Sequence, residues 1–154
     1  MKLIRILIAG LAAAFLAGCS QLSGAVDLAP IPYSFYPPAG LDSKLSVELM
    51  TGQWYDDAVA SGIESAVTVT YTPDKGQPAI LMGVYYMPES VFDAAANPNE
   101  PPIYGTLVTR SRGDGFVLSV AGPQDSIYDP ETDDGKNISL LYEAIYNIES
   151  YIPR

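Results

Sequence analysis

The stretch VTVTYTPDKGQPAILMGVYY, residues 67–86, decides the fold class of this chain. Residues 67–72 alternate valine or tyrosine with threonine, which is typical of a β-strand with one buried face. Residues 73–76, PDKG, predict a turn. Residues 79–86, AILMGVYY, are apolar and predict a strand covered on both faces. The stretch therefore predicts two neighbouring strands of one sheet.

The segments on either side of this stretch add further strands and a short helix. Residues 44–49, KLSVEL, alternate polar and apolar side chains and predict another strand. Residues 104–111 and 115–121 predict a hairpin around the sequence RGDG. Pro88 suits the first position of a short helix, which should stop before Asn97 because the following proline disfavours its continuation.

The end of the chain carries the clearest helical pattern. One apolar stripe of helical spacing is formed by Ile138, Leu141, Ile145, Ile148 and Ile152. Asn137 suits the N-cap of this helix and Pro153 its end. We therefore expect an α+β fold: an antiparallel sheet of about five or six strands, with a C-terminal helix packed on one face and one short internal helix.

The first residues have the pattern of a secretory signal. Two basic residues precede thirteen uncharged ones, residues 6–18, which is short of the roughly 20 that a membrane-spanning helix needs. Leu16-Ala17-Gly18-Cys19 resembles the lipobox of bacterial lipoproteins. This resemblance implies cleavage between Gly18 and Cys19 and a diacylglycerol on the sulfur of Cys19, the only cysteine in the chain. Two or three acyl chains would anchor the protein stably to a membrane.

The resemblance also divides the chain and places it in the cell envelope. We expect a signal peptide over residues 1–18, a lipidated and proline-rich tether over 19–40, and one α+β domain over 41–154. Because Ser20 is not aspartate, the lipoprotein pattern implies the outer membrane, facing the periplasm, in a Gram-negative host. In any other host it implies the outer face of the cell membrane.

The proline-rich segment has two interpretations. As extended, polyproline-like chain it could hold the domain up to roughly 65 Å from the anchor. Alternatively, part of it packs on the domain, because Tyr33, Phe35 and Tyr36 are costly to leave in water. Tyr33 and Phe35 alternate with Ser34, which would suit an edge strand.

The composition excludes several classes of function. Eighteen acidic residues face eight basic ones, and removal of the signal leaves only six cations. Such a charge repels phosphate backbones, so no nucleic-acid partner is expected. The chain has no histidine, and therefore lacks the usual general base and the commonest metal ligand. No internal disulfide and no cofactor are expected.

A short aromatic motif supplies the first candidate site. Gly52-Gln53-Trp54-Tyr55 resembles the G-x-W signature of lipocalins, small β-barrels that hold apolar ligands. This resemblance implies an apolar carrier; otherwise Trp54 is a core or hinge aromatic after a glycine turn. Trp54 and Tyr55 are also candidates for contact with a partner. Eleven tyrosines, including the pair Tyr85-Tyr86, offer further contact surface.

An acidic segment, residues 125–137, supplies a weak calcium candidate. Its ligands would be Asp129, Glu131, Asp133 and Asp134. The EF-hand pattern fails, because counting from Asp129 places Asp134 and Leu140 where glycine and glutamate are required. The alternative is a solvated acidic loop leading into a helix N-terminus.

Arg110 and Arg112 lie two residues apart on the expected hairpin and share one strand face. They would either clamp an anionic partner or keep the hairpin edge charged against self-association. Together these features favour a non-enzymatic, membrane-anchored binding or accessory module with an envelope protein as partner. A lipocalin-like carrier is the alternative, and a hydrolase using two carboxylates is a weaker one.

Overall fold

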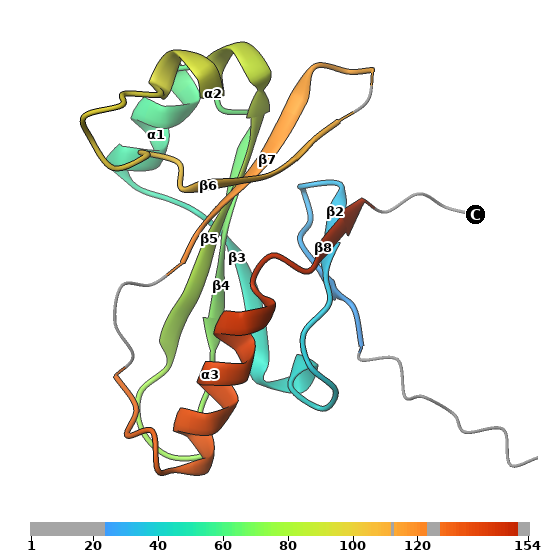
Figure 1. Cartoon of the computed structure of the whole chain (residues 1–154), viewed down its shortest axis with the longest axis vertical. Helices are drawn as coiled ribbons and strands as arrows, with labels where there is room; N and C mark the ends of the chain where they lie inside the picture. Colours follow the sequence, from blue (N-terminus) through green and yellow to red (C-terminus); the bar gives the residue numbers. More distant parts are fainter. Residues whose placement is uncertain (1–23, 112, 123–126, 151–154) are drawn as a thin grey trace, which may run out of the picture.

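The computed structural model describes residues 24–111, 113–122 and 127–150 of the chain. The described residues form two antiparallel sheets, three α-helices and a short 3₁₀ helix (Figure 1). The larger sheet has five strands in the order β3-β4-β5-β7-β6 and the smaller has three in the order β1-β2-β8. The expected α+β class, with a five-stranded antiparallel sheet, is confirmed.

The elements have the following bounds. The five-stranded sheet consists of β3 (Leu45–Leu49), β4 (Ser65–Tyr71), β5 (Ala79–Pro88), β6 (Thr106–Arg110) and β7 (Phe116–Ala121). The small sheet consists of β1 (Val26–Asp27), β2 (Tyr33–Phe35) and β8 (Ile148–Ser150). The helices are η1 (Asp42–Lys44), α1 (Gln53–Ala60), α2 (Glu89–Ala95) and α3 (Asp133–Ala144).

The stretch over residues 67–86 forms the centre of the larger sheet, as predicted. Strands β4 and β5 pair antiparallel from Ser65 opposite Tyr86 to Tyr71 opposite Ala79. In β4, Val67, Val69 and Tyr71 are fully buried while the alternating threonines are partly exposed. Strand β3 pairs with the outer side of β4, and β6 and β7 form the predicted hairpin.

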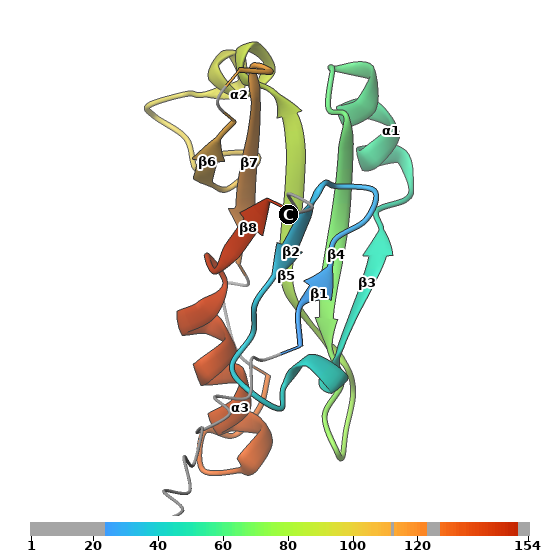
Figure 2. The same cartoon turned by 90° about the vertical axis from the view of Figure 1, so that its right-hand side faces the viewer.

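One face of the five-stranded sheet is covered by α3 and the small sheet, which lie on the same side (Figure 2). Apolar residues of β4, β5 and β7 pack there against Ile138 and Leu141 of α3 and against Phe35 of β2. Ile145 and Ile148, which follow α3, complete this main core.

Part of the segment before Leu41 packs on the folded body, which is the second of the two interpretations that the proline-rich sequence allowed. Leu28 and Phe35 are fully buried in the main core, and Ile31 is nearly so. Strand β2 pairs with β8 from the other end of the chain. Burial of these aromatic and aliphatic side chains offsets the entropic cost of ordering the segment. Residues 26–36 are therefore not an extended tether, and the domain begins before residue 41.

The C-terminal helix is shorter than the apolar stripe suggested. It ends at Ala144, and Ile148 lies in β8. Its N-cap is Thr132, whose side chain accepts a hydrogen bond from the N–H of Gly135, and not Asn137. The open edge of β2 explains the change to a strand, because residues 148–150 pair with it. Ile152 and Pro153 lie outside the described residues.

Among the described residues, the helices α1 and α2 cover the opposite face of the sheet near one end (Figure 1). Helix α2 follows Pro88 and ends at Ala95, as predicted. Helix α1 was not expected. A second core lies beneath these helices and contains Ala58, Ile63, Ala66, Tyr85, Met87, Tyr104 and Val117.

Candidate functional site

Three aromatic side chains gather at the edge of the second core. Trp54 of α1 contacts the rings of Tyr85 in β5 and Tyr104 in the loop before β6, with centroids 5.8 and 6.5 Å away. The rings of Tyr85 and Tyr104 are 5.8 Å apart. All three pairs are tilted or edge-on, the arrangement that the quadrupoles of aromatic rings favour. We refer to Trp54, Tyr85 and Tyr104 as the aromatic cluster.

The cluster has one exposed and two buried members. Trp54 is 48% exposed, whereas Tyr85 and Tyr104 are each 8% exposed. The two tyrosines therefore form a fixed support, and the indole of Trp54 presents apolar surface to solvent. Trp54 is thus not a core aromatic, although it does follow a glycine at the start of a helix: Gly52 has φ +97°. Tyr55 is partly buried and packs against the second core.

The structure around Trp54 also corrects the fold that the lipocalin resemblance implies. The G-x-W motif begins a helix instead of leading into a barrel strand. The five-stranded sheet is open, with β3 and β6 as its outer strands. A lipocalin barrel is closed by eight strands. The lipocalin resemblance therefore does not extend to the fold.

A glycine makes room for the tyrosine support. A Cβ atom on Gly83 would lie 2.8 Å from the hydroxyl oxygen of Tyr85 and 2.9 Å from the terminal methyl of Met50. The side chain of Tyr85 therefore occupies the space above Gly83, two residues earlier on the same strand face. Burial, followed by the neighbouring Tyr104, raises the pKa of the Tyr85 hydroxyl, which stays protonated at neutral pH.

Ser119 lies on the same sheet face, directly opposite Tyr85 in the register of β5 and β7. It is fully buried, and its hydroxyl makes no hydrogen bond to any described residue. Because the chain contains no histidine, the usual base that would activate such a hydroxyl is missing.

Helix α1 and the turn that follows it carry only acidic charged residues. Residues 53–64 carry Asp56, Asp57 and Glu64 and no basic residue. Asp57 is three residues after Trp54 in α1, so the two side chains are neighbours on the helix surface. The Asp57 carboxylate accepts a hydrogen bond of 2.8 Å from the Gln53 amide.

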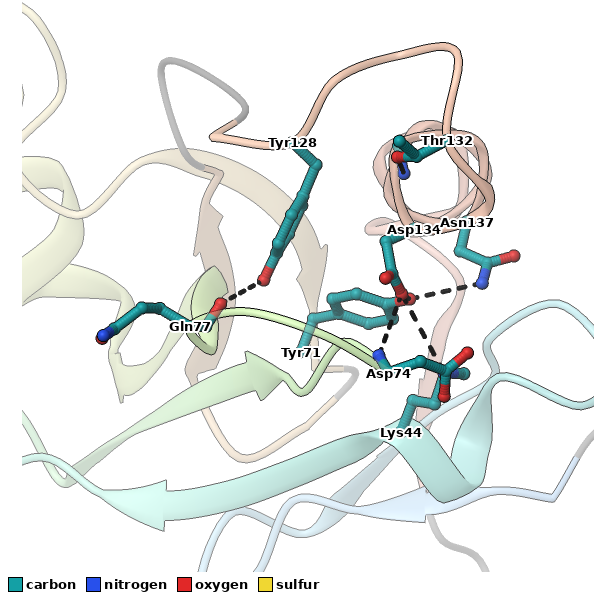
Figure 3. A network of polar contacts seen from close by, with 9 residues as sticks. Lys44, Tyr71, Asp74, Gln77, Tyr128, Thr132, Asp134 and Asn137 are labelled. Atoms are coloured by element: carbon teal, nitrogen blue, oxygen red, sulfur yellow. Dashed lines mark hydrogen bonds and ion pairs between the residues drawn. The ribbon is translucent and has the colours of Figure 1, made fainter.

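A polar network lies at the other end of the sheet (Figure 3). The hydroxyl of Tyr71 donates a 2.6 Å hydrogen bond to Asp134, and the Asn137 amide donates to the Tyr71 oxygen at 3.3 Å. Asp134 also accepts from the backbone N–H of Asp74 at 3.3 Å. The Lys44 ammonium is 2.7 Å from Asp74 and 4.0 Å from Asp134. This network joins the first turn of α3 to the end of β4 and to η1.

The network sets the protonation of its members. The hydrogen bond from Tyr71 is the main reason that the pKa of Asp134 is lowered, and the N–H of Asp74 and the charge of Lys44 act in the same direction. The pKa of Tyr71 is raised, mainly by burial and then by Asp134. The short hydrogen bond between the phenol and the carboxylate thus lowers the pKa of Asp134 and adds to the effect of burial on Tyr71. The network thus has a structural task.

The acidic segment does not assemble a calcium site. Within the described parts of the chain, no three Asp, Glu, His or Cys side chains lie close enough to hold a metal ion. Asp129 accepts from the N–H of Glu131, and its carbonyl accepts from Thr132. Asp133 and Asp134 occupy the first turn of α3, where negative charge is favoured.

Arg110 is occupied within the protein. Its guanidinium pairs with Glu89 and, at 3.3 Å, with Asp93, so it joins β6 to α2. Arg112 lies outside the described residues. The pair Tyr85-Tyr86 is divided between the two faces of the sheet, because Tyr86 points toward the main core and stacks on Phe116 at 4.8 Å. The abundance of tyrosines in the sequence suggested a contact surface. It did not indicate that Tyr85 and Tyr104 are the tyrosines in contact with Trp54.

Comparisons with known proteins add no family to this description. No protein-family model, curated protein or solved structure matches the chain. Gly18 and Cys19 lie outside the described residues. Of the helices that the structure describes, none combines the length and apolar character needed to cross a bilayer.

Proposed function

We propose that this chain is a lipid-anchored protein of the cell envelope whose folded body is a non-enzymatic binding or accessory module. The anchor is carried by one observation: a single cysteine, Cys19, follows Leu-Ala-Gly after a basic start and a short apolar run. A thiol at the new N-terminus is the nucleophile that lipoprotein acylation uses, and two or three acyl chains suffice for stable membrane binding.

The aromatic cluster supports the binding role of the body. An indole that is half exposed on a buried tyrosine support costs free energy in water, and such surfaces are typical of contact sites. Tryptophan and tyrosine are also the residues most enriched at the energetic centres of protein interfaces.

The described side chains give less support to an enzyme. Ser119 is buried without a base, and Asp134 is held by structural hydrogen bonds. Glu89 and Asp93, two carboxylates that contact the same guanidinium, are both ion-paired with Arg110.

The anchor is tested by mass analysis of the protein isolated from a bacterial host. We expect residues 1–18 to be absent and Cys19 to carry a diacylglycerol and an N-acyl group. Cys19→Ser should leave the protein unlipidated and release it from the membrane fraction, whereas Ser23→Ala, in the same segment, should change nothing. Recovery of an intact residue 1–18 segment, or of an unmodified Cys19, would overturn the proposal.

The position of Ser20 makes the location testable in a Gram-negative host. By resemblance to the lipoprotein class, the wild-type protein should fractionate with the outer membrane. Ser20→Asp should shift it to the inner membrane without changing the mass of the attached lipid. An identical distribution of the two proteins would contradict the outer-membrane assignment while leaving the anchor intact.

A further inference from the structure

We infer that the aromatic cluster is a docking site for a cationic side chain, arginine or lysine, of a protein partner. The inference rests on the proposed binding function and specifies both its site and the chemistry of its partner. It follows from the exposure of one ring, the distribution of charge around it and the position of the cluster relative to the start of the folded body.

The exposed indole is a suitable acceptor for a cation. Trp54 is the only tryptophan in the chain, and its ring is held in place by Tyr85 and Tyr104. Tryptophan is the strongest cation–π acceptor among the side chains, and arginine also stacks on its face. Ile103, which precedes Tyr104 in the chain, is also 56% exposed.

The charge at this end of the body favours a cation. Asp57 lies within one helical turn of Trp54 and is exposed, and Asp56 precedes it. The cations among the described residues are Lys44, Lys75, Arg110 and Lys136. Lys44 belongs to the polar network, Lys75 supplies it with a backbone N–H, and Lys136 follows Asp134 by two residues. Arg110 is paired with two carboxylates.

No described cation therefore compensates the α1 carboxylates. A basic group that approaches Trp54 would meet an aromatic face and a carboxylate together, and the overall negative charge of the body would steer it there. A neutral sugar would also stack on the indole and its hydroxyls would donate hydrogen bonds to Asp57, but it would gain nothing from the uncompensated negative charge. This charge complementarity is why we assign a cationic side chain and not a glycan.

The geometry of the body presents the cluster away from the proposed anchor. Gly24, the first described residue, lies against Asp42 in η1, just before β3 begins. Helix α1 begins four residues after β3 ends, so η1 and α1 lie toward the two ends of this strand (Figure 2). If lipid on Cys19 holds the Gly24 end of the body at the bilayer, the cluster lies at the far end of β3. A protein partner suits this orientation, whereas a lipid headgroup does not.

Because Trp54 is the only tryptophan in the chain, its fluorescence can report binding at the cluster. We would titrate the lipidated mature protein, in detergent micelles, with an acetylated and amidated Gly-Arg-Gly-Arg-Gly peptide and follow the fluorescence of Trp54. The matched peptide replaces each arginine with citrulline, which keeps the shape and removes the charge. We expect a saturable change with the arginine peptide that weakens in high salt, and a response at least about tenfold weaker with citrulline.

Three variants distinguish binding at the aromatic cluster from nonspecific electrostatic attraction to the acidic body. Asp57→Asn should weaken binding about threefold, as expected for one exposed charge. Trp54→Leu, measured by calorimetry, should weaken it about fivefold to tenfold. Glu143→Gln removes the same charge from an exposed position in α3 and should leave binding unchanged. Because Asp57→Asn leaves the rings intact, the test does not depend on whether the Trp54 variant folds.

Three outcomes would overturn the inference. These are equal binding of the citrulline peptide, an equal loss with Glu143→Gln, and a Trp54 response to neutral maltohexaose in place of the arginine peptide; the last would make the cluster a glycan site. Each is distinct from failure of the proposed anchor, which is read from the mass at Cys19. An unmodified Cys19 together with arginine-dependent binding would reject the envelope assignment and leave the docking site standing.

Discussion

Tyr71 and Asp134, which are 63 residues apart in the chain, are joined by a hydrogen bond of 2.6 Å. The donor lies at the end of the central strand β4 and the acceptor in the first turn of α3. This bond adds a polar link to the apolar contacts that hold the helix against the sheet. It is the best-defined polar link between the sheet and its covering layer.

Removal of the phenol oxygen should weaken this link. Tyr71→Phe keeps the buried ring and deletes the hydrogen bond to Asp134, and we expect a loss of about 1–2 kcal/mol in the free energy of unfolding. Urea denaturation measures it. Tyr146→Phe removes a phenol oxygen from a half-exposed side chain and serves as the control, with an expected change below about 0.5 kcal/mol. Equal effects of the two changes would contradict a structural role for the Tyr71 hydroxyl.

The lowered pKa of Asp134 predicts how stability depends on pH. A carboxyl whose pKa is lower in the folded state stabilises that state at pH values above its unfolded pKa, near 3.8. This contribution is lost as the pH falls from there through the folded pKa. Asp134→Asn should therefore reduce stability at pH 7, and the difference from the wild type should shrink below pH 4. Denaturation at several pH values measures this difference, and a difference that grows on acidification would contradict the sign.

Substitution of Gly105 should be costly because of a steric clash with β7, in addition to its positive φ angle. Gly105 and Gly115 have φ values of +73° and +75°, so alanine at either position costs about 1–2 kcal/mol in backbone strain. A Cβ on Gly115 meets nothing within 4 Å, whereas one on Gly105 collides with the carbonyl of Val120 and lies 2.6 Å from the nitrogen of Ala121. Gly105→Ala should therefore cost about 1–3 kcal/mol more than Gly115→Ala in thermal or urea unfolding. Equal costs would show that β6 and β7 move apart freely.

The ion pairs of Arg110 should contribute little and should respond to salt. Arg110→Gln removes the contacts to Glu89 and Asp93, all of which are largely solvent-exposed, and we expect a loss of about 0.5–1 kcal/mol. The loss should diminish in 1 M NaCl because the pairs are screened. Lys75→Gln, in the exposed turn between β4 and β5, is the control for the change in net charge. A salt-independent loss would point to packing of the arginine stem.

The buried hydroxyl of Ser119 should cost stability. With no hydrogen-bond partner among the described residues, it is dehydrated without compensation. Ser119→Ala should leave stability unchanged or raise it by up to about 1 kcal/mol, as measured by urea denaturation. A clear loss would show that the hydroxyl has a partner after all.

The strands could be read from the sequence because their side-chain pattern is local. The alternation in β3 and β4 and the apolar run of β5 report burial on one or both faces, and the hairpin of β6 and β7 is marked by its glycines. The end of α3 could not be read in the same way. The sequence around Ile148 suits either a continuation of the helix or a strand. The pairing with β2, which lies over 100 residues earlier in the sequence, selects the strand.

Helix α1 and the aromatic cluster required information that no local pattern holds. Helix α1 is short, and only Ala58 of its residues is buried, so it has no apolar stripe to recognise. Tyr85 and Tyr104 meet Trp54 because β5 and the loop before β6 are brought together by sheet topology. The motif around Trp54 drew attention to a residue that is exposed in the structure, but through resemblance to a fold that the chain does not have.

The folding of residues 26–36 into the body limits how far the protein can operate from a lipid on Cys19. Only four residues, 20–23, separate that position from Gly24, and at full extension five Cα–Cα steps cover about 18 Å. The body would therefore lie close to the lipid headgroups. An unfolded proline-rich tether would instead allow it to move tens of ångströms from the membrane surface. Any partner of the body would therefore have to bind it close to the membrane surface.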